Sequence, residues 1–179
     1  MMDATQREAA HRAASDAELI CWVDAQDNLL GHLVRSDLRR RGLIGRCTFI
    51  FLFNSKGELC VHRRTLSKAL YPGFWDTAAG GMVAAGESYA ESAARELEEE
   101  LGVSGVVLNE HDHFFFEDGD SRLWCKSYSA VWDGLLCLQP EEVMEARFLP
   151  IETILSEARQ KPYCPDAQEG LRRYLALRR

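Results

Sequence analysis

The sequence lacks the features that mark several large classes of protein. The longest apolar run, Cys47–Phe53, is far shorter than the ~20 residues that a helix needs to cross a bilayer. The start MMDATQREAAHR contains no apolar stretch of the kind found in signal peptides. The six cysteines are scattered without a C-x-x-C pair, which leaves the usual zinc spacing absent. We therefore expect a cytoplasmic protein, without membrane contact, whose thiols are reduced and mostly buried.

Basic residues are outnumbered, which narrows the range of partners. Lys and Arg total 21 against 28 Asp and Glu, a formal net charge of −7. Such a chain has no general positive field for binding nucleic acid, although a local site can still bind a small anion. With 179 residues, 46% of them hydrophobic, we expect one globular domain over residues 16–179. The segment 1–15 is predicted to be loosely ordered.

Most of the negative charge lies in one short segment, Glu87–Gly102, which contains six glutamates and one arginine. Ser88 followed by Glu91 is a capping-box pattern that begins a helix, and Gly102 is a typical residue to end one. The segment therefore predicts a helix over about Ser88–Leu101. Its apolar residues recur at three- and four-residue steps and form one face that packs on a core: Ala90, Ala93, Ala94, Leu97 and Leu101.

One flank of this predicted helix gathers three carboxylates. At ~100° per residue, Glu96 and Glu100 lie about 40° apart, and Glu99 lies about 60° to the other side of Glu96. A solvated acidic face is the usual meaning of such a run. Because like charges at this spacing repel, a divalent cation held between the carboxylates would offset the repulsion and explain the arrangement. Oxygen ligands favour Mg²⁺ or Mn²⁺ over Zn²⁺.

The residues just before the helix are predicted to form a tight loop. Gly80 and Gly81 precede the residues MVAA, and Gly86 follows them, so the backbone can approach a ligand or metal closely. Arg95 is the one cation of the predicted helix, and its guanidinium can hold the carboxylate of Glu87 through two hydrogen bonds. This contact would fix the loop onto the helix.

Taken together, these residues resemble the Nudix box, G-x5-E-x7-R-E-U-x-E-E-x-G-U, in which U is aliphatic. Every fixed position is matched over Gly81–Val103, and so many fixed residues at fixed spacings make a highly specific motif. The surrounding region, Asp16–Pro150, is similar to the branch of the family that contains isopentenyl-diphosphate isomerase and related bacterial hydrolases.

The resemblance implies an α+β fold, in which a mixed β-sheet is flanked by helices in an α/β/α sandwich and the box (81–103) forms a loop–helix–loop. The rest of the chain agrees with this fold. The sequence predicts an N-terminal hairpin (18–35), a second hairpin (47–64), later strands (122–131 and 145–149) and two C-terminal helices (151–159 and 166–177).

The resemblance also implies an activity, namely metal-dependent hydrolysis of a diphosphate linked to another moiety, with Mg²⁺ or Mn²⁺ as cofactor. A small-molecule diphosphate is then the expected partner, and the protein is expected to be a monomer or homodimer. The residues implied are Glu96 and Glu100 as main metal ligands, Glu99 as a further ligand or the general base, the Gly80 carbonyl as another ligand, and Glu87 and Arg95 as orienting residues.

The general base is not fixed by the box, because a carboxylate on a later loop can serve instead. Glu141, Glu142 and Glu145 are candidates, although a solvated acidic turn explains each of them more simply.

Substrate phosphates require cations. Arg63 and Arg64 at a predicted strand end, with Lys68 four residues later, are candidates, since strand alternation points one arginine inward. Phe74 and Trp75 could stack on a base, or pack in the core. Solvation of a strand end explains the two arginines equally well.

Two other functions are weighed against hydrolysis. An isomerase of the related branch requires a cysteine where Gly80 stands, a histidine where Met82 stands and a glutamate near Leu123, so isomerisation is disfavoured. A non-enzymatic diphosphate sensor would usually have lost box glutamates, and all are present here. His111 and His113 would share one face of a strand, but no further ligand for a second metal site can be named.

Overall fold

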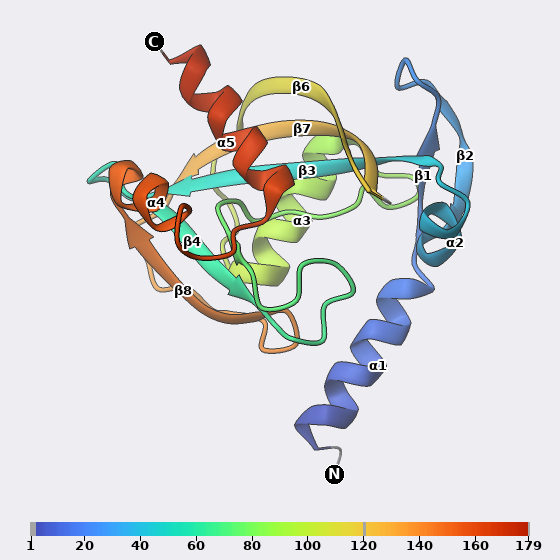
Figure 1. Cartoon of the computed structure of the whole chain (residues 1–179), viewed down its shortest axis with the longest axis horizontal. Coiled ribbons are helices and arrows are strands. Elements are labelled where there is room, and N and C mark those ends of the chain that lie inside the picture. The colour runs from blue at the N-terminus through green and yellow to red at the C-terminus, as the bar shows by residue number, and fades with distance from the viewer. Residues whose placement is uncertain (1–2, 120, 179) are drawn as a thin grey trace.

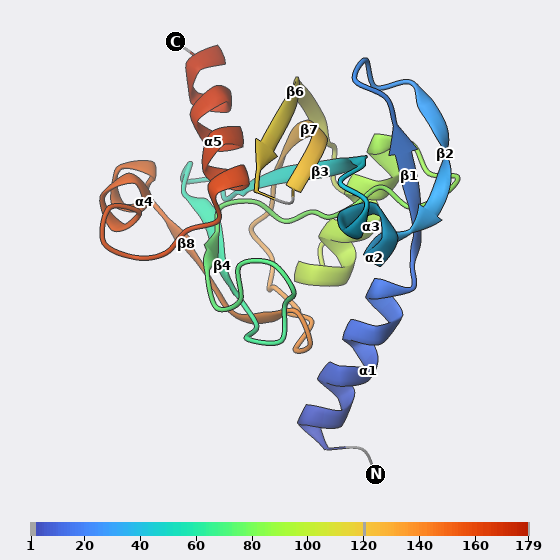
Figure 2. The same ribbon diagram turned by 45° about the vertical axis from the view of Figure 1, so that its right-hand side comes forward.

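The structure, a computed structural model, describes residues 3–119 and 121–178 of the chain. Within these residues, eight strands form one sheet and five helices surround it (Figures 1 and 2). The helices are α1 (Ala4–Asp16), α2 (Arg35–Arg40), α3 (Tyr89–Leu101), α4 (Ile151–Glu157) and α5 (Pro165–Leu177). The strands are β1 (Leu19–Val23), β2 (Leu29–Val34), β3 (Ile44–Phe53), β4 (Leu59–Arg64), β5 (Trp75–Asp76), β6 (Asn109–Asp118), β7 (Ser121–Val131) and β8 (Val143–Leu149).

Strand β3 is the centre of the sheet. It runs parallel to β7 over nine residue pairs, from Gly45 opposite Leu123 to Phe53 opposite Val131. It is antiparallel to β1 and β4, while β2, β6 and β8 pair with the outer edges of β1, β7 and β4. The short strand β5 pairs with His62 and Arg63 of β4, on the edge opposite β8. Nearly every side chain of β3 is buried, as expected for a strand covered on both faces. The predicted mixed sheet flanked by helices is confirmed.

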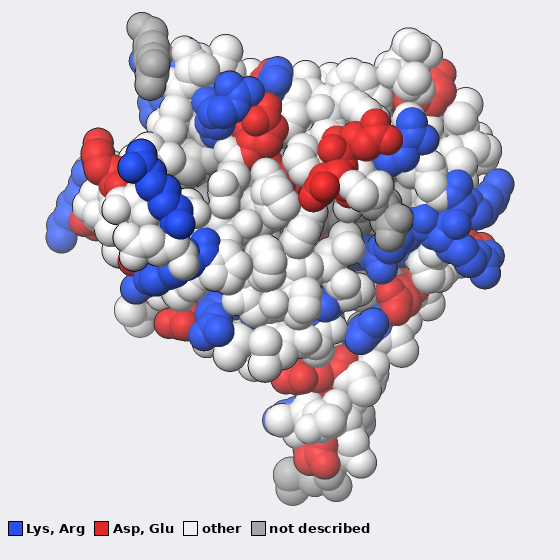
Figure 3. Space-filling view, in the orientation of Figure 1, with Lys and Arg blue, Asp and Glu red and all other residues white. Residues whose placement is uncertain are grey.

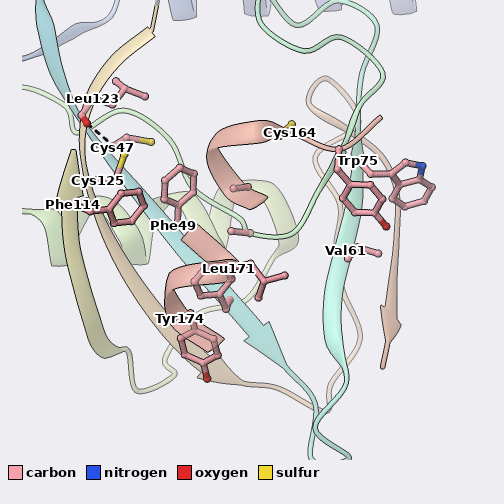
Figure 4. Close-up of a cluster of buried hydrophobic side chains, with 14 of the residues drawn as sticks. Cys47, Phe49, Val61, Trp75, Phe114, Leu123, Cys125, Cys164, Leu171 and Tyr174 are labelled. Carbon is pink, nitrogen blue, oxygen red and sulfur yellow. Dashed lines mark hydrogen bonds between the residues drawn. The ribbon is translucent and has the colours of Figure 1, made fainter. Parts of the chain in front are cut away.

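The two faces of β3 support two separate hydrophobic clusters. Phe49 lies on the face that α5 covers, near Leu171 and Tyr174 (Figure 4). Phe51 points the same way and contacts Tyr174 with ring centroids 5.1 Å apart. Ile50 and Leu52 point the opposite way and pack with residues of α3. Figure 1 shows the same arrangement, with α5 in front of the sheet and α3 behind it. Alternation along one strand therefore anchors α3 against a rigid sheet.

Most predicted elements occupy their expected positions. The N-terminal hairpin is formed by β1 and β2, and β3 and β4 pair where they approach their turn. The predicted helix 151–159 ends at Glu157. Outside the segment 1–15, no range was predicted for α2, for β5 or for β6, although a strand was considered around His111 and His113. Strand β6 pairs with β7 along most of its length.

The prediction that residues 1–15 are loosely ordered is wrong for the described part of that segment. Helix α1 begins after Asp3, whose carboxylate accepts from the Gln6 N–H at 2.8 Å, while the Gln6 side chain accepts from the Asp3 N–H at 3.0 Å. This reciprocal cap satisfies two backbone donors that would otherwise be unpaired. Met1 and Met2 lie outside the described residues. No helix in residues 3–119 and 121–178 is long and apolar enough to cross a membrane.

Candidate active site

Helix α3 carries the acidic segment and has the predicted ends. The Ser88 hydroxyl accepts from the Glu91 N–H at 3.2 Å, and the Glu91 carboxylate accepts from the Ser88 N–H at 2.8 Å. Gly102 ends the helix in the left-handed conformation, with φ 68°. Ala93 and Leu97 on the apolar face are buried against the sheet. The polar face is therefore held at a fixed position relative to the core.

Arg95 is the centre of the polar face of α3. Its Nε and Nη2 donate to the two carboxylate oxygens of Glu87 at 2.7 and 3.0 Å, which confirms the predicted two-point contact. Its Nη1 donates to Glu96 and to Glu99, each at 3.0 Å. One guanidinium thus joins the box loop to two carboxylates of the helix.

The three predicted metal ligands on α3 differ in depth. The side chain of Glu99 is 49% exposed, that of Glu96 is 12% exposed, and Glu100 is 2% exposed. The backbone N–H of Gly80 donates to Glu100 Oε2 at 3.1 Å. Glu100 therefore lies just behind the loop, directly beside the glycine that was predicted to contribute a ligand.

The glycine loop packs closely against the acidic helix. A Cβ at Gly81 would lie 2.5 Å from Glu96 Oε1, a distance that excludes any side chain unless Glu96 moves. The loop itself is fixed to the sheet, since the Thr48 N–H donates to the Gly81 carbonyl at 2.9 Å. The absence of a side chain at Gly81 leaves space for the Glu96 carboxylate.

Burial perturbs the two inner carboxylates. Burial raises the pKa of Glu96 to about 7, although Arg95 acts in the opposite direction. Burial also raises the pKa of Glu100, and the negative charge of Glu142 adds to the effect. Desolvation disfavours the charged form of a carboxylate. Burial therefore destabilises the charged form of both groups. The side-chain donors here are all oxygen atoms, which suit a hard divalent cation.

A cavity of about 400 Å³ opens in front of these residues. Its floor is the box loop and α3, and its other walls come from α1, α2 and the segments around Lys68 and Glu142. The lining residues are His11, Ala14, Ser15, Glu18, Arg35, Lys68, Gly80, Gly81, Ala84, Glu87, Arg95, Glu96, Glu99 and Glu142.

Of the five residues considered for substrate binding, Lys68 lines this cavity, whereas Arg63, Arg64, Phe74 and Trp75 do not. Arg63 Nε donates to the Gly73 carbonyl at 3.1 Å, and Arg64 Nη2 donates to the Leu70 carbonyl at 3.2 Å. Trp75 is 8% exposed and belongs to the core cluster on the α5 side of the sheet, against which Phe74 packs (Figure 4). The two arginines hold the loop between β4 and β5, and the two aromatic residues serve packing.

Of the acidic residues predicted as alternative bases, only Glu142 reaches the cavity. Its carboxylate contacts His11 Nε2 at 2.6 Å and Lys68 Nζ at 2.5 Å. Burial alone would raise the pKa of Glu142, but Lys68 and His11 outweigh this effect and lower the pKa to about 2. Glu145 is half exposed, and its nearest described cation is Arg63 at 3.8 Å.

The sequence reasoning missed the residues that the N-terminal part of the chain brings to the cavity. His11, Ser15 and Glu18 recur at helical spacing, and Arg35 begins α2. The spacing of four and then three residues was the available signal. It was overlooked because the segment was expected to lack regular structure.

The residues considered for an isomerase active site lie in the protein interior. Leu123 and Met82 are each 8% exposed, and Cys125 is fully buried with its pKa raised by burial. A protonated, enclosed thiol is a poor nucleophile. His111 bonds to the Ser129 hydroxyl at 2.7 Å, whereas His113 pairs with Asp27 at 2.9 Å, so each histidine has a structural partner of its own.

The fold and this loop–helix site are those of a Nudix domain, and comparison with known proteins agrees. A family model described as NUDIX domain matches residues 44–173. An uncharacterized Nudix hydrolase of Pseudomonas aeruginosa is 68% identical over 166 residues, which cover 93% of this chain and 98% of that protein. The Nudix hydrolase YfcD of Escherichia coli is 38% identical over 160 residues, covering 89% and 88% of the two chains.

A crystal structure from Deinococcus radiodurans superposes with a TM-score of 0.76 at 28% identity, covering 87% of this chain and 98% of that one. The chain belongs to the Nudix hydrolase family. It is therefore an enzyme of the pyrophosphohydrolase class, a class that generally uses divalent metal ions.

Proposed function

We propose that this enzyme uses Mg²⁺, or Mn²⁺, to hydrolyse the diphosphate bond of a nucleoside diphosphate linked to another moiety, or of a similar metabolite. The observation that carries the proposal is the pair of buried carboxylates, Glu96 and Glu100. Glu96 lines the cavity, and Glu100 lies behind the glycine loop, bonded to the Gly80 N–H. A buried acidic pair of this kind is destabilised while both groups are charged, and a divalent cation relieves that cost.

Glu96, Glu99 and Glu100 are the residues that would hold the cation, with the Gly80 backbone beside them. No three His, Cys, Asp or Glu side chains in the described part of the chain are already grouped as a metal site, and Arg95 engages Glu96 and Glu99. Cation binding therefore involves a local exchange of these contacts. When bound, the cation neutralises phosphate charge and lowers the pKa of a bound water.

The reaction requires a water molecule to attack one phosphorus atom, after which the bridging P–O bond breaks and two phosphorylated products leave. A carboxylate accepts the proton of that water. Both carboxylate oxygens of Glu142 are engaged, one by His11 and one by Lys68, and these contacts lower its pKa. Glu142 is therefore better suited to holding Lys68 than to accepting a proton. Glu99, which is exposed at the cavity, remains the candidate general base within the box. Glu87 and Arg95 orient the carboxylates.

The alternatives receive less support from the same residues. The isomerase reaction lacks its cysteine at Gly80, and Cys125 is enclosed. A diphosphate sensor on this fold would bind without turnover, yet every acidic residue of the box is present. Conversion of isopentenyl to dimethylallyl diphosphate would restore the first alternative, and tight diphosphate binding without turnover in Mg²⁺ would favour the second.

The test is the release of phosphorylated products in Mg²⁺ from nucleoside diphosphates, sugar nucleotides, dinucleotides and isoprenoid diphosphates. Chromatography detects nucleoside monophosphates and sugar phosphates, and a colorimetric assay detects phosphate or pyrophosphate. The native chain is compared with Glu100→Gln, which keeps the size of the side chain and removes its charge. Glu98→Gln is the matched control, because Glu98 carries the same charge on the same helix but is exposed, whereas Glu100 is buried and bonds to the Gly80 N–H of the loop.

Release by the native chain and by Glu98→Gln, with a loss of at least about a hundredfold in Glu100→Gln, would support the proposal. Equal rates in Glu100→Gln and the native chain would contradict the metal role of Glu100. Absence of release from the whole panel would count against hydrolysis of these substrates.

A further inference from the structure

One face of helix α1 lines the catalytic cavity. His11, Ala14, Ser15 and Glu18 are spaced three and four residues apart, which places them on one side of a helix. Glu18 follows the helix end but stays close to it, since its N–H donates to the Ser15 carbonyl at 3.2 Å. No residue of α1 is buried, so core packing does not explain why this face is polar and why it meets the cavity.

Two residues of this face hold Arg35. Its Nη1 donates to the Ser15 hydroxyl at 2.8 Å and contacts Glu18 Oε2 at 3.4 Å. The backbone N–H of Arg35 also donates to the Glu18 carbonyl at 2.8 Å. The Arg35 side chain is 26% exposed, so its charge is only partly screened by solvent. Arginine has five N–H donors in a fixed fork, and these contacts leave donors for an anion.

His11, another residue of this face, is connected to Lys68 through Glu142. His11 Nε2 contacts one carboxylate oxygen of Glu142 at 2.6 Å, and Lys68 Nζ contacts the other at 2.5 Å. The side chains of Glu142 and Lys68 are only 15% and 19% exposed. A lysine has four flexible side-chain bonds, and this carboxylate limits its freedom at the wall of the cavity.

Arg35 and Lys68 differ from the other cation of the cavity. Arg95 is paired with three carboxylates of the box, whereas Arg35 and Lys68 each contact one carboxylate. Arg35 and Lys68 lie on the wall shared with a smaller neighbouring cavity of about 70 Å³. Figure 3 shows Lys and Arg side chains gathered over α2, on the side of the molecule where this wall lies. That smaller cavity adds three further cations, Arg12, Arg39 and Arg64.

We propose that Arg35 and Lys68 bind the phosphate groups of the substrate, and that His11, Ser15 and Glu18 of the α1 segment are positioning residues for these two cations. The inference rests on the proposed function of the same site and assigns the phosphate ligands that Arg63 and Arg64 do not provide. Charged hydrogen bonds between a guanidinium or ammonium and phosphate oxygens are strong and directional. Helix α1 is thereby part of substrate recognition.

The first test measures binding, independently of turnover. Methylenediphosphonate, whose P–C–P link resists hydrolysis, is titrated into the native chain in Mg²⁺ by isothermal calorimetry. Arg35→Met and Lys68→Met each remove one charge-assisted contact, and we expect each to weaken binding about tenfold or more. Arg7→Ala is the control, because Arg7 is an exposed residue of α1 that lines neither cavity.

Absence of binding to the native chain, or equal affinity in all four proteins, would overturn the inference. Thermal unfolding of each variant shows whether it is folded. Because binding is measured without hydrolysis, the two proposals can fail separately. Loss of binding in the variants with no hydrolysis of any substrate contradicts the proposed function alone. Normal binding and turnover in the variants contradicts this inference alone.

The second test concerns the positioning role of His11, with a substrate that the panel identifies. Leucine at position 11 cannot contact Glu142 through a hydrogen bond, whereas glutamine can donate one from its side-chain amide. We expect His11→Leu to raise KM severalfold with kcat changed less than twofold, and His11→Gln to restore most of the native KM. An unchanged KM in His11→Leu, or no rescue by His11→Gln, would show that His11 only attaches the helix to the domain.

Discussion

Replacing Gly81 by alanine tests whether the position of the Glu96 carboxylate controls the reaction. An added Cβ would lie 2.5 Å from Glu96 Oε1, 2.7 Å from Cδ and 2.9 Å from Oε2. The carboxylate must therefore retreat by at least about half an ångström before the contact becomes tolerable. Because the three nearest atoms all belong to the end of one side chain, the displacement is confined to the group whose position matters.

The expected effect on activity is much larger than the effect on stability. Misplacing a catalytic group by about 1 Å can reduce a rate about a hundredfold, so we expect kcat to fall about ten- to a hundredfold in Gly81→Ala. Alanine also reduces the conformational freedom of the unfolded chain, which stabilises by about 0.4–1 kcal/mol where the backbone is compatible. This gain offsets much of the cost of moving Glu96, and the net change in unfolding free energy should stay within about 1 kcal/mol.

The control variant is Gly57→Ala, in the turn between β3 and β4. A Cβ there meets nothing within 4 Å, but the backbone has φ +79°, which costs a non-glycine residue about 1–2 kcal/mol. For a chain of this size we expect Tm to fall by about 2–8 °C, with kcat unchanged. Initial rates and thermal unfolding are measured on both variants. Full activity in Gly81→Ala, or equal losses of activity in the two variants, would refute the steric argument.

Two further predictions concern Arg95 and His62. Arg95→Lys replaces the guanidinium that bridges Glu87, Glu96 and Glu99 by a single ammonium, which cannot make these contacts together. We expect kcat to fall at least about tenfold with little change in Tm. Unaltered kinetics would show that Arg95 does not orient the carboxylates. Burial lowers the pKa of His62 from 6.5 to about 4, with Arg64 and Lys68 acting in the same direction and Asp76 opposing. The unfolded state then binds the proton more readily, so stability is retained above pH 6.5 and lost as pH falls toward 4, by on the order of 3 kcal/mol for this group. Urea unfolding at pH 7.5 and 4.5 should show a smaller difference for His62→Gln than for the native chain, and equal differences would contradict this assignment.

The part of the site that could be predicted from the sequence is the part built from neighbouring residues. The cap at Ser88, the end at Gly102 and the contact between Glu87 and Arg95 all lie within one turn or a few turns of a helix. Their geometry follows from helical periodicity and local hydrogen bonding. The alternation of β3 side chains between the two faces of the sheet likewise follows from strand geometry, whereas the mixed sheet itself was expected from the resemblance to the Nudix family.

The walls of the cavity could not be predicted in this way. His11, Arg35, Lys68 and Glu142 belong to four separate segments, and their proximity depends on how those segments pack. Strand alternation predicted that one of Arg63 and Arg64 points inward, but both side chains bond to carbonyls of the loop that follows β4. A distance along the chain does not give a distance in space when a loop and a sheet intervene.

The box carboxylates and the cations proposed to bind phosphate lie on different walls of the cavity, and this separation bears on substrate specificity. The acidic helix and its loop form one continuous segment anchored on the rigid sheet, where the carboxylates can be held within the small tolerances that catalysis requires. The residues of the opposite wall come from distant segments, and α1 among them has no buried side chain. Substitutions in that wall can change which phosphate compound binds without disturbing the core or the carboxylates. We therefore infer that the reaction is determined by residues 81–103, whereas the substrate is selected mainly by the wall that contains Arg35 and Lys68.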